Sequence, residues 1–276
     1  MGGGHQIHNH LIRGRGGDIR VRDYVPRVTV GAPFLWVHGG GFHSGHVDTR
    51  ESDAPARYLA DRGRWVRTID YRLAPRVGLT GAVRLGAHPG RFPAGHDDVV
   101  DVARSLVAES GCEIHLGGAS AGASLAAGAA MALRDVGGEL VRSLVCAYGT
   151  FHAELPANID IEDELRGPIA RWAFNPGQMS RMNINYVGSP DALTPGYAFP
   201  GGAPLVGMPP ALVLDARNDR LRRSGAAFAD ELRAADVEVQ YEVVNAMHAF
   251  LGKPGSVAFA KGMTTIGSWL DRFVED

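Results

Sequence analysis

A glycine stands two residues before Ser120 and another two residues after it, in the pattern Gly-x-Ser-x-Gly. The pattern follows an apolar run, residues 114–117, that suits a buried strand, and it precedes a run of small residues, 121–133, that suits a helix. A serine on such a strand-to-helix turn projects its hydroxyl from the sheet, and the glycines keep strand and helix from colliding. The start of the helix also directs backbone N–H groups toward the reacting oxygen. We therefore predict that Ser120 is a nucleophile.

Three glycines follow His38 directly after the apolar run 34–37. Because glycine has no side chain, such a run lets backbone N–H groups point into a site without obstruction. Two of these donors, together with the N–H of Ala121 after the nucleophile, would form an oxyanion hole. A phosphate-binding loop is the alternative, but the run lacks the Lys-Ser/Thr of a P-loop and the spacing of a dinucleotide fingerprint.

A nucleophilic serine needs a base, and the base needs a carboxylate that orients it. Among the 11 histidines, His248 follows a strand-like run in a short loop, at the sheet edge where a base must lie. Two carboxylates, Asp215 and Asp219, end or follow the strand-like run 211–214. Asp219 lies in the loop beyond the strand and is favoured by its position, whereas Asp215 could merely stabilise the turn. The chain order Ser120, Asp219, His248 is the order found in α/β-hydrolases.

The elements that must position these residues alternate between strand-like and helical along the chain. This alternation predicts an α/β fold with a mostly parallel central sheet and helices on both faces, in a single domain spanning residues 1–276. The expected strands cover residues 7–13, 19–24, 34–37, 65–70, 114–117, 140–148, 211–214 and 237–244. The expected helices cover residues 53–62, 121–133, 221–234 and 256–274, and a long loop covers 76–95. A further helix has Asp97 and Asp98 in its first turn and reaches about Ser110.

Regular alternation is lost from residue 152 to about residue 209, where Gly, Pro and Asn accumulate around one helical piece near 161–174. This block is too long for an ordinary connection. We predict that it is a small cap inserted over the carboxyl edge of the sheet, where ligands bind in open α/β folds. Its aromatic residues could line a substrate pocket or form the cap's own small core.

Length and composition exclude several classes of protein. The chain has 276 residues, 45% of them hydrophobic, which is enough for one large core, and its formal net charge is −2. The absence of a basic excess argues against a nucleic-acid partner. No stretch approaches the ~18 apolar residues of a membrane span, and residues 1–10 have no apolar signal core. We therefore expect a soluble, cytoplasmic protein, and a homo-oligomer is compatible with the sequence.

The cysteines and the N-terminal histidines have simple interpretations. The two cysteines, Cys112 and Cys146, lie in apolar, strand-like runs and are expected to be buried, reduced thiols. The three histidines His5, His8 and His10 could chelate a metal, but surface histidines on an N-terminal strand are the preferred interpretation.

Several ordered motifs resemble the hormone-sensitive-lipase family of esterases, within the α/β-hydrolase superfamily. The resemblance extends from about Ile7 to the C-terminus. The motifs are His38-Gly39-Gly40-Gly41-Phe42, Tyr71-Arg72-Leu73-Ala74-Pro75, Phe92-Pro93-Ala94-Gly95-His96-Asp97-Asp98, Asp219-Arg220-Leu221 with Gly225, and His248-Ala249-Phe250. The chain departs from the family at Ala119, before the nucleophile, and in an insertion from Arg76 to about Arg91.

The resemblance implies an α/β-hydrolase fold and a reaction that needs neither a cofactor nor a metal. It implies that Gly40, Gly41 and Ala121 donate to the oxyanion, and it favours Asp219 over Asp215 as the acid. The candidate substrate-binding residues are Phe42, Trp172, Phe174, Tyr186 and Phe250.

The expected function is hydrolysis of small, short-acyl carboxylic esters through a Ser-His-Asp triad and an acyl-enzyme intermediate. One alternative is an amidase or aryl-formamidase on the same scaffold, because amide cleavage uses the same groups. A second alternative is a non-catalytic binder of small molecules. Plant gibberellin receptors, which resemble the family, have lost the catalytic histidine, so the presence of His248 argues against this interpretation.

Overall fold

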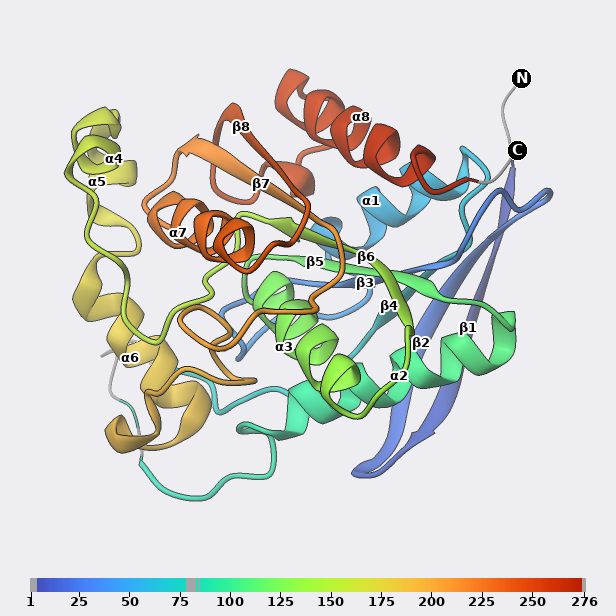
Figure 1. Ribbon diagram of the computed structural model, residues 1–276, viewed down its shortest axis with the longest axis horizontal. Helices are drawn as coiled ribbons and strands as arrows, with labels where there is room; N and C mark the ends of the chain where they lie inside the picture. The colour runs from blue at the N-terminus through green and yellow to red at the C-terminus, as the bar shows by residue number, and fades with distance from the viewer. Residues whose placement is uncertain (1–3, 78–82, 84, 275–276) are drawn as a thin grey trace.

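The computed structural model describes residues 4–77, 83 and 85–274 (Figure 1). Within them, eight strands form one sheet in the order β1-β2-β4-β3-β5-β6-β7-β8. The six strands from β3 to β8 run parallel, whereas β1 and β2 form an antiparallel hairpin at one edge. The strands are β1 (His5–Gly14), β2 (Gly17–Pro26), β3 (Phe34–Val37), β4 (Val66–Ile69), β5 (Ile114–Ala119), β6 (Val141–Ala147), β7 (Ala211–Asn218) and β8 (Val239–Met247).

Helices cover both faces of the sheet and bury two apolar clusters. In β3 the side chains of Leu35 and Val37 join the cluster under α2, α3 and α7, whereas Phe34 and Trp36 join the cluster under α1 and α8. This is the two-residue alternation of a strand that is buried on both faces. The helices are α1 (Arg50–Ala60), α2 (Ala94–Ser110), α3 (Ala121–Asp135), α7 (Arg222–Ala234) and α8 (Val257–Asp271). The predicted α/β architecture, with a mostly parallel sheet covered on both faces, is confirmed.

Several local predictions need correction. Helix α1 begins at Arg50, three residues before the predicted start at Asp53, because Thr49 provides the extended residue at its N-terminus. Helix α2 begins at Ala94 and ends at Ser110, and Asp97 lies in its first turn as predicted. Both cysteines are free, but Cys112 is exposed and only Cys146 is buried, since Cys112 lies in the turn before β5 and not in the strand.

The block from residue 152 to residue 209 holds more helix than predicted. Its elements are α4 (Ile159–Glu164), α5 (Gly167–Trp172), α6 (Pro176–Val187) and the 3₁₀ turn η1 (Pro190–Ala192). A second 3₁₀ turn, η2 (Phe250–Gly252), follows β8. A proline in the first turn starts both α5 and α6, and a capping box at Asn175 stabilises the start of α6. Helices α4 and α5 lie together and α6 lies apart from them (Figure 1), and between α4 and α5 the Arg166 N–H donates to the side chain of Asn218, at the end of β7, at 2.7 Å.

Of the helices in the described part of the chain, none combines the length and the apolar character that crossing a bilayer requires.

Arg67 of β4 is a fully buried cation that bridges two carboxylates. It donates to both oxygens of Asp23, each at 2.7 Å, and to both oxygens of Glu109. Replacing Arg67 with methionine is expected to lower the free energy of unfolding by about 3 kcal/mol, because it leaves the buried Asp23 charge without its partner. Urea unfolding checks this. Arg13→Met, which removes only an exposed pair with Asp18, should change stability by less than about 1 kcal/mol. Equal losses in both variants would contradict the prediction.

Candidate active site

Ser120 occupies a sharp turn between β5 and α3. Its backbone dihedrals are φ 54° and ψ −123°, a strained conformation for a residue with a side chain. A Cβ on Gly122 would lie 2.2 Å from the carbonyl oxygen of Val37, and a Cβ on Gly118 would lie 2.5 Å from the backbone of Gly122. Both glycines are therefore required where the strand meets the helix. The turn predicted from the Gly-x-Ser-x-Gly pattern is present.

Two hydrogen bonds join Ser120, His248 and Asp219. The Nε2 atom of His248 lies 3.1 Å from the Oγ of Ser120, and its Nδ1 atom lies 2.6 Å from the Oδ2 of Asp219. Asp219 follows β7 and His248 follows β8, and these strands are parallel neighbours whose carboxyl ends meet at one edge. The second oxygen of Asp219 accepts the N–H of Leu221, which fixes the carboxylate. All three predicted residues therefore lie within hydrogen-bond reach.

The environment of His248 favours the protonated ring. Burial by itself lowers the pKa of His248, but the charge of Asp219, the hydrogen bond to it, and the charge of Glu51 together raise the pKa above 6.5. An Nδ1–H that donates to Asp219 leaves Nε2 free to accept the hydroxyl proton of Ser120. The geometry therefore matches a general base that becomes an imidazolium when it takes that proton.

Asp215 lies in a different environment from Asp219. It is fully buried, and a Cβ on Gly225 would lie 2.1 Å from its Oδ2 atom, so its carboxyl packs against α7. Burial, and then the nearby charge of Asp219, raise the pKa of Asp215 well above its ordinary value. The carboxylate that contacts His248 is that of Asp219.

The glycine run forms a tight loop next to Ser120. Gly40 and Gly41 have φ values of 121° and 60°, and a Cβ on Gly40 would lie 2.0 Å from the carbonyl oxygen of Ser44. A Cβ on Gly39 would lie 3.0 Å from the Cβ of Ser120. Within the described residues, the N–H groups of Gly40, Gly41 and Ala121 have no hydrogen-bond acceptor. All three predicted donors are therefore available to a ligand.

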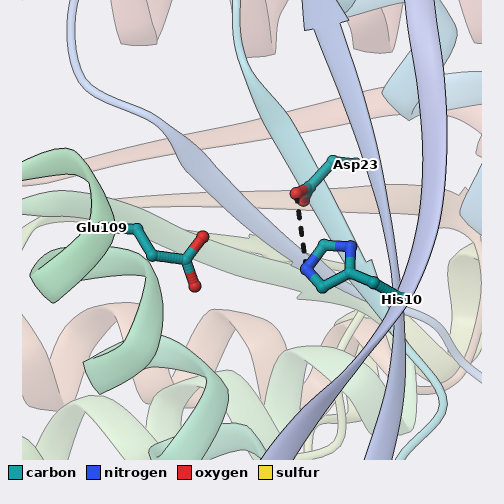
Figure 2. A group of neighbouring side chains, drawn as sticks. All are labelled: His10, Asp23 and Glu109. Carbon is teal, nitrogen blue, oxygen red and sulfur yellow. Dashed lines mark ion pairs between the residues drawn. The ribbon is translucent and has the colours of Figure 1, made fainter.

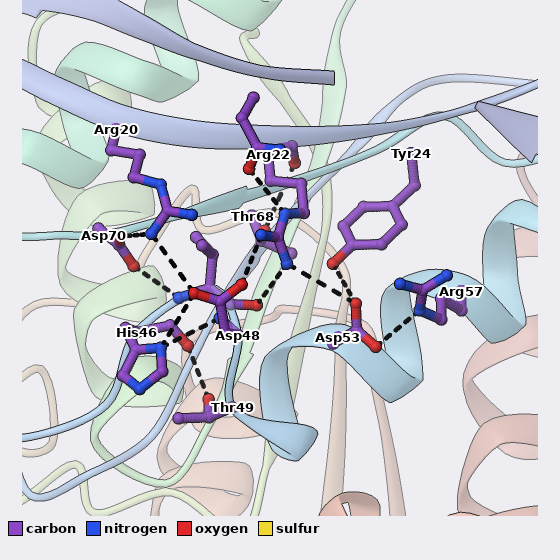
Figure 3. A network of polar contacts seen from close by, with 12 residues as sticks. Arg20, Arg22, Tyr24, His46, Asp48, Thr49, Asp53, Arg57, Thr68 and Asp70 are labelled. Carbon is purple, nitrogen blue, oxygen red and sulfur yellow. Dashed lines mark hydrogen bonds and ion pairs between the residues drawn. The ribbon is translucent and has the colours of Figure 1, made fainter. Parts of the chain in front are cut away.

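A polar network holds the far end of this loop (Figure 3). The N–H of Val47 donates to Asp70 at 2.6 Å, and Asp48 accepts hydrogen bonds from Arg20 and Arg22. These contacts tie the loop to β2 and to the end of β4. Asp70 is not among the predicted site residues, although its place directly after the buried strand β4 is a signal that the local sequence contains.

A pocket of about 340 Å³ opens beside His248. Phe174, whose ring centroid lies 4.6 Å from that of His248, forms one wall together with α5. The lining is mostly apolar and consists of Ile169, Ala170, Ala173, Phe174, Asn218, Asp219, Arg220, Met247, His248 and Lys253. Residues of the block 152–209 therefore contribute to a cavity that borders His248 and Asp219.

The other four aromatic candidates differ in their burial and in the residues that they contact. Phe42 stacks on Tyr186 of α6 with ring centroids 4.0 Å apart, and both are buried. Trp172 is 70% exposed and does not line the pocket beside His248. Phe250 is buried in the cluster under α1 and α8 and packs edge-on against Tyr148. Of the five candidates, Phe174 is the one in ring contact with His248.

A group of possible metal ligands lies away from this site, at His10, Asp23 and Glu109 (Figure 2). The Arg67 guanidinium already donates to both carboxylates, so the cluster fits an arginine better than a metal ion. His5 and His10 are an odd number of residues apart on β1, so their side chains point to opposite faces of the strand. The N-terminal histidines thus do not converge on one ion.

Comparison with known proteins agrees with this geometry. A family model described as the alpha/beta hydrolase fold matches residues 34–252. Carboxylesterase NlhH of Mycobacterium tuberculosis is 32% identical over 235 residues, which cover 80% of this chain and 64% of that protein. Esterase LipI of the same species is 30% identical over 269 residues, covering 93% of this chain and 78% of LipI. The chain therefore spans less than two thirds of the length of NlhH.

Solved structures extend the comparison to nearly the whole chain. An esterase of Pyrobaculum calidifontis superposes with a TM-score of 0.82 at 31% identity, covering 97% of this chain and 85% of that one. EstE1, a carboxylesterase cloned from a metagenomic library, superposes with a TM-score of 0.83 at 24% identity, which shows the fold alone. Since the family match covers most of the chain, the protein belongs to the hormone-sensitive-lipase-like family of α/β-hydrolases.

Proposed function

We propose that the protein is a carboxylesterase that hydrolyses small, short-acyl esters through Ser120, His248 and Asp219. The observation that carries the proposal is the pair of hydrogen bonds that links these residues at the strained turn, at 3.1 Å and 2.6 Å. The relatives NlhH and LipI, named carboxylesterase and esterase, support the same reaction class. They also favour esters over the amides of the alternative hydrolase.

The first half-reaction forms the acyl-enzyme. Ser120 Oγ attacks the ester carbonyl carbon while His248 Nε2 takes the hydroxyl proton, and Asp219 stabilises the resulting imidazolium. The carbonyl oxygen becomes an oxyanion that accepts hydrogen bonds from the N–H groups of Gly40, Gly41 and Ala121. The C–O bond to the alcohol then breaks, and His248 returns its proton to the leaving alkoxide.

The second half-reaction repeats these steps with water. His248 takes a proton from water, and the hydroxide oxygen attacks the acyl carbon to form a second tetrahedral intermediate. That intermediate collapses with cleavage of the bond to Ser120 Oγ, which regains its proton from His248. The carboxylic acid product leaves, and the enzyme returns to its starting state without a cofactor.

The block from residue 152 to residue 209 acts in this proposal as a cap that limits substrate size. Phe174 and α5 form a wall of the pocket of about 340 Å³ beside His248, and α6 contributes Tyr186, which stacks on Phe42 after the glycine run. A small, mostly apolar cavity favours compact acyl groups over long chains. A non-catalytic binder would need no base next to the serine, whereas His248 is in hydrogen-bond contact with Ser120.

The test is a series of p-nitrophenyl esters with acyl chains from acetate to dodecanoate, assayed at one pH by kcat/KM. The proposal expects the highest value at the shortest chains and a steady fall toward dodecanoate. A matched p-nitroanilide measures the amide alternative and should react far more slowly than the ester. A maximum at the longest chain would contradict the short-acyl specificity, and an anilide that reacts as fast as the ester would favour the amidase.

Arg220, the residue directly after Asp219, holds the backbone that precedes Phe174. It donates to the carbonyl oxygens of Arg171 and Ala173, each at 2.7 Å, and forms a two-pronged pair with Glu162. These contacts fix the wall of the pocket relative to the loop that carries the triad acid.

Arg220→Ala is therefore expected to raise KM for p-nitrophenyl esters roughly ten-fold while lowering kcat less than about three-fold. Steady-state kinetics across the chain-length series measure both constants. Arg217→Ala is the matched control, because Arg217 also pairs with a glutamate of α4 but lies exposed, and it should leave KM within about two-fold. An unchanged KM in Arg220→Ala would show that the wall does not contact substrate.

A further inference from the structure

Glu51 lies in the first turn of α1, at the point where the glycine run, β6 and the loop after His248 meet. Its backbone carbonyl accepts a hydrogen bond from outside the helix. Pro55, four residues later, has no N–H, so the carbonyl of Glu51 lacks the donor that a continuous helix would supply. The Nε1–H of Trp36, from β3, donates to that carbonyl at 2.9 Å. The start of α1 is thereby tied to the strand that leads into the glycine run.

The carboxylate of Glu51 lies between the glycine run and the nucleophile. A Cβ on Gly39 would lie 2.4 Å from the Oε2 of Glu51 and 3.0 Å from the Cβ of Ser120. Because one point next to Gly39 is close both to the Glu51 carboxylate and to Ser120, the carboxylate lies beside the turn that carries Ser120. Glu51 is half-buried, so its charge is screened less than that of a fully exposed residue.

Tyr148 connects Glu51 to the base. Its hydroxyl donates to the Oε1 of Glu51 at 2.8 Å, and its ring packs edge-on against His248 with centroids 5.0 Å apart. Tyr148 is fully buried and adopts a positive φ of 38°, which an L-residue keeps only where its surroundings enforce it. Burial, and then the charge of Glu51, raise the pKa of Tyr148 well above its ordinary value, so the phenol remains a neutral donor.

Two carboxylates, Asp219 and Glu51, act on His248 in different ways. Asp219 is hydrogen-bonded to its ring, and Glu51 acts on it through space. Two cations, Arg220 and Lys253, line the pocket beside His248. Arg220 is paired with Glu162, and Lys253 is exposed to solvent. Glu51 is therefore a second carboxylate that favours a positive charge on His248 without a hydrogen bond to the ring.

We propose that Glu51 is a positioning residue of the reaction centre, which holds Tyr148 against His248 and stabilises by its charge the imidazolium formed in each tetrahedral intermediate. This inference rests on the proposed esterase function. The hydrogen bond fixes the ring that packs on His248, and the negative charge offsets the proton that His248 takes from Ser120 and later from water.

The test compares Glu51→Gln with Asp53→Asn. The first keeps an acceptor for Tyr148 but removes the charge, and the second removes a charge from the same helix where it pairs with Arg57 and Tyr24. Glu51→Gln is expected to lower kcat for p-nitrophenyl acetate about three- to ten-fold with KM within two-fold. It should also move the titration of His248, followed by NMR of ¹⁵N-labelled histidine, to lower pH. Asp53→Asn should change neither quantity.

A third variant separates the two roles of Glu51. Tyr148→Phe keeps the ring and the charge of Glu51 but removes the hydrogen bond, so kcat should fall about two-fold while the titration of His248 stays in place. The proposal is overturned if Glu51→Gln lowers only the unfolding temperature and leaves both kcat and the His248 titration unchanged. The titration needs no substrate, so a wild type without ester turnover would refute the esterase function separately.

Discussion

Replacing Ser120 with alanine is expected to lower kcat for p-nitrophenyl acetate by about 10⁴-fold or more. The variant lacks the oxygen that forms the acyl-enzyme. Acylation and deacylation are therefore replaced by a direct attack of water on the ester. His248 and the three N–H donors near Ser120 are still present, and they account for the residual rate above that of the uncatalysed reaction. The measurement is kcat from initial rates, with the pre-steady-state burst of nitrophenolate as a second readout.

The control for this variant is Ser105→Ala, on the exposed side of α2, where the hydroxyl donates to Glu109. Its kcat should stay within about two-fold of the wild type. Labelling by a fluorophosphonate probe gives an answer that does not depend on the substrate, because only an activated serine reacts with it. If Ser120→Ala kept more than about one hundredth of the activity, or still took up the probe, another residue would have to be the nucleophile.

The strained turn at Ser120 could be predicted from sequence because its requirements are local. Gly118 and Gly122 are needed where strand and helix touch, and the clash of a Cβ at either position involves backbone only a few residues away or on the neighbouring strand. The pairing of Asp219 with His248 was predictable for a related reason. Both residues follow parallel strands, and adjacent parallel strands end at the same edge of a sheet.

Glu51 and Tyr148 could not be identified in this way. Their contact joins residues 97 positions apart, and neither residue lies in a pattern that indicates chemistry. The local pattern gave no signal, because the predicted helix began at Asp53, and a proline in a first turn frees no carbonyl within the helix. Only the observed start at Arg50 places Pro55 inside the helix and leaves the carbonyl of Glu51 without a donor from the helix.

The aromatic residues of the block 152–209 show a second limit of the sequence. Without a regular period, sequence position does not determine which way a side chain points. Trp172 and Phe174 are two residues apart, yet one is 70% exposed and the other contacts the ring of His248. The chain bends between them, and Phe174 takes a positive φ of 54°. The sequence therefore predicted an irregular insertion but not the wall that it forms.

The second large effect concerns two aspartates, Asp215 in β7 and Asp219 directly after it. Asp219→Asn is expected to lower kcat/KM for p-nitrophenyl acetate by about 10³- to 10⁴-fold, because an amide can donate to the ring and favour the wrong tautomer of His248. The charge of Asp219 also contributes to the raised pKa of His248. Catalysis needs the neutral ring, so the wild type loses activity as the pH falls through that raised pKa. In the variant this acid limb should move to lower pH.

Asp215→Asn removes the other carboxylate and should leave kcat/KM within about three-fold of the wild type. Burial and the charge of Asp219 raise the pKa of Asp215, which favours the neutral acid, and asparagine has nearly the same shape as that acid. The two substitutions are therefore chemically identical, lie four residues apart, and differ in whether the group contacts His248. If Asp215→Asn lost as much activity as Asp219→Asn and shifted the acid limb equally, the orienting role could not be assigned to the hydrogen bond at 2.6 Å. A loss confined to Asp219→Asn would instead tie both the rate and its pH dependence to that one contact.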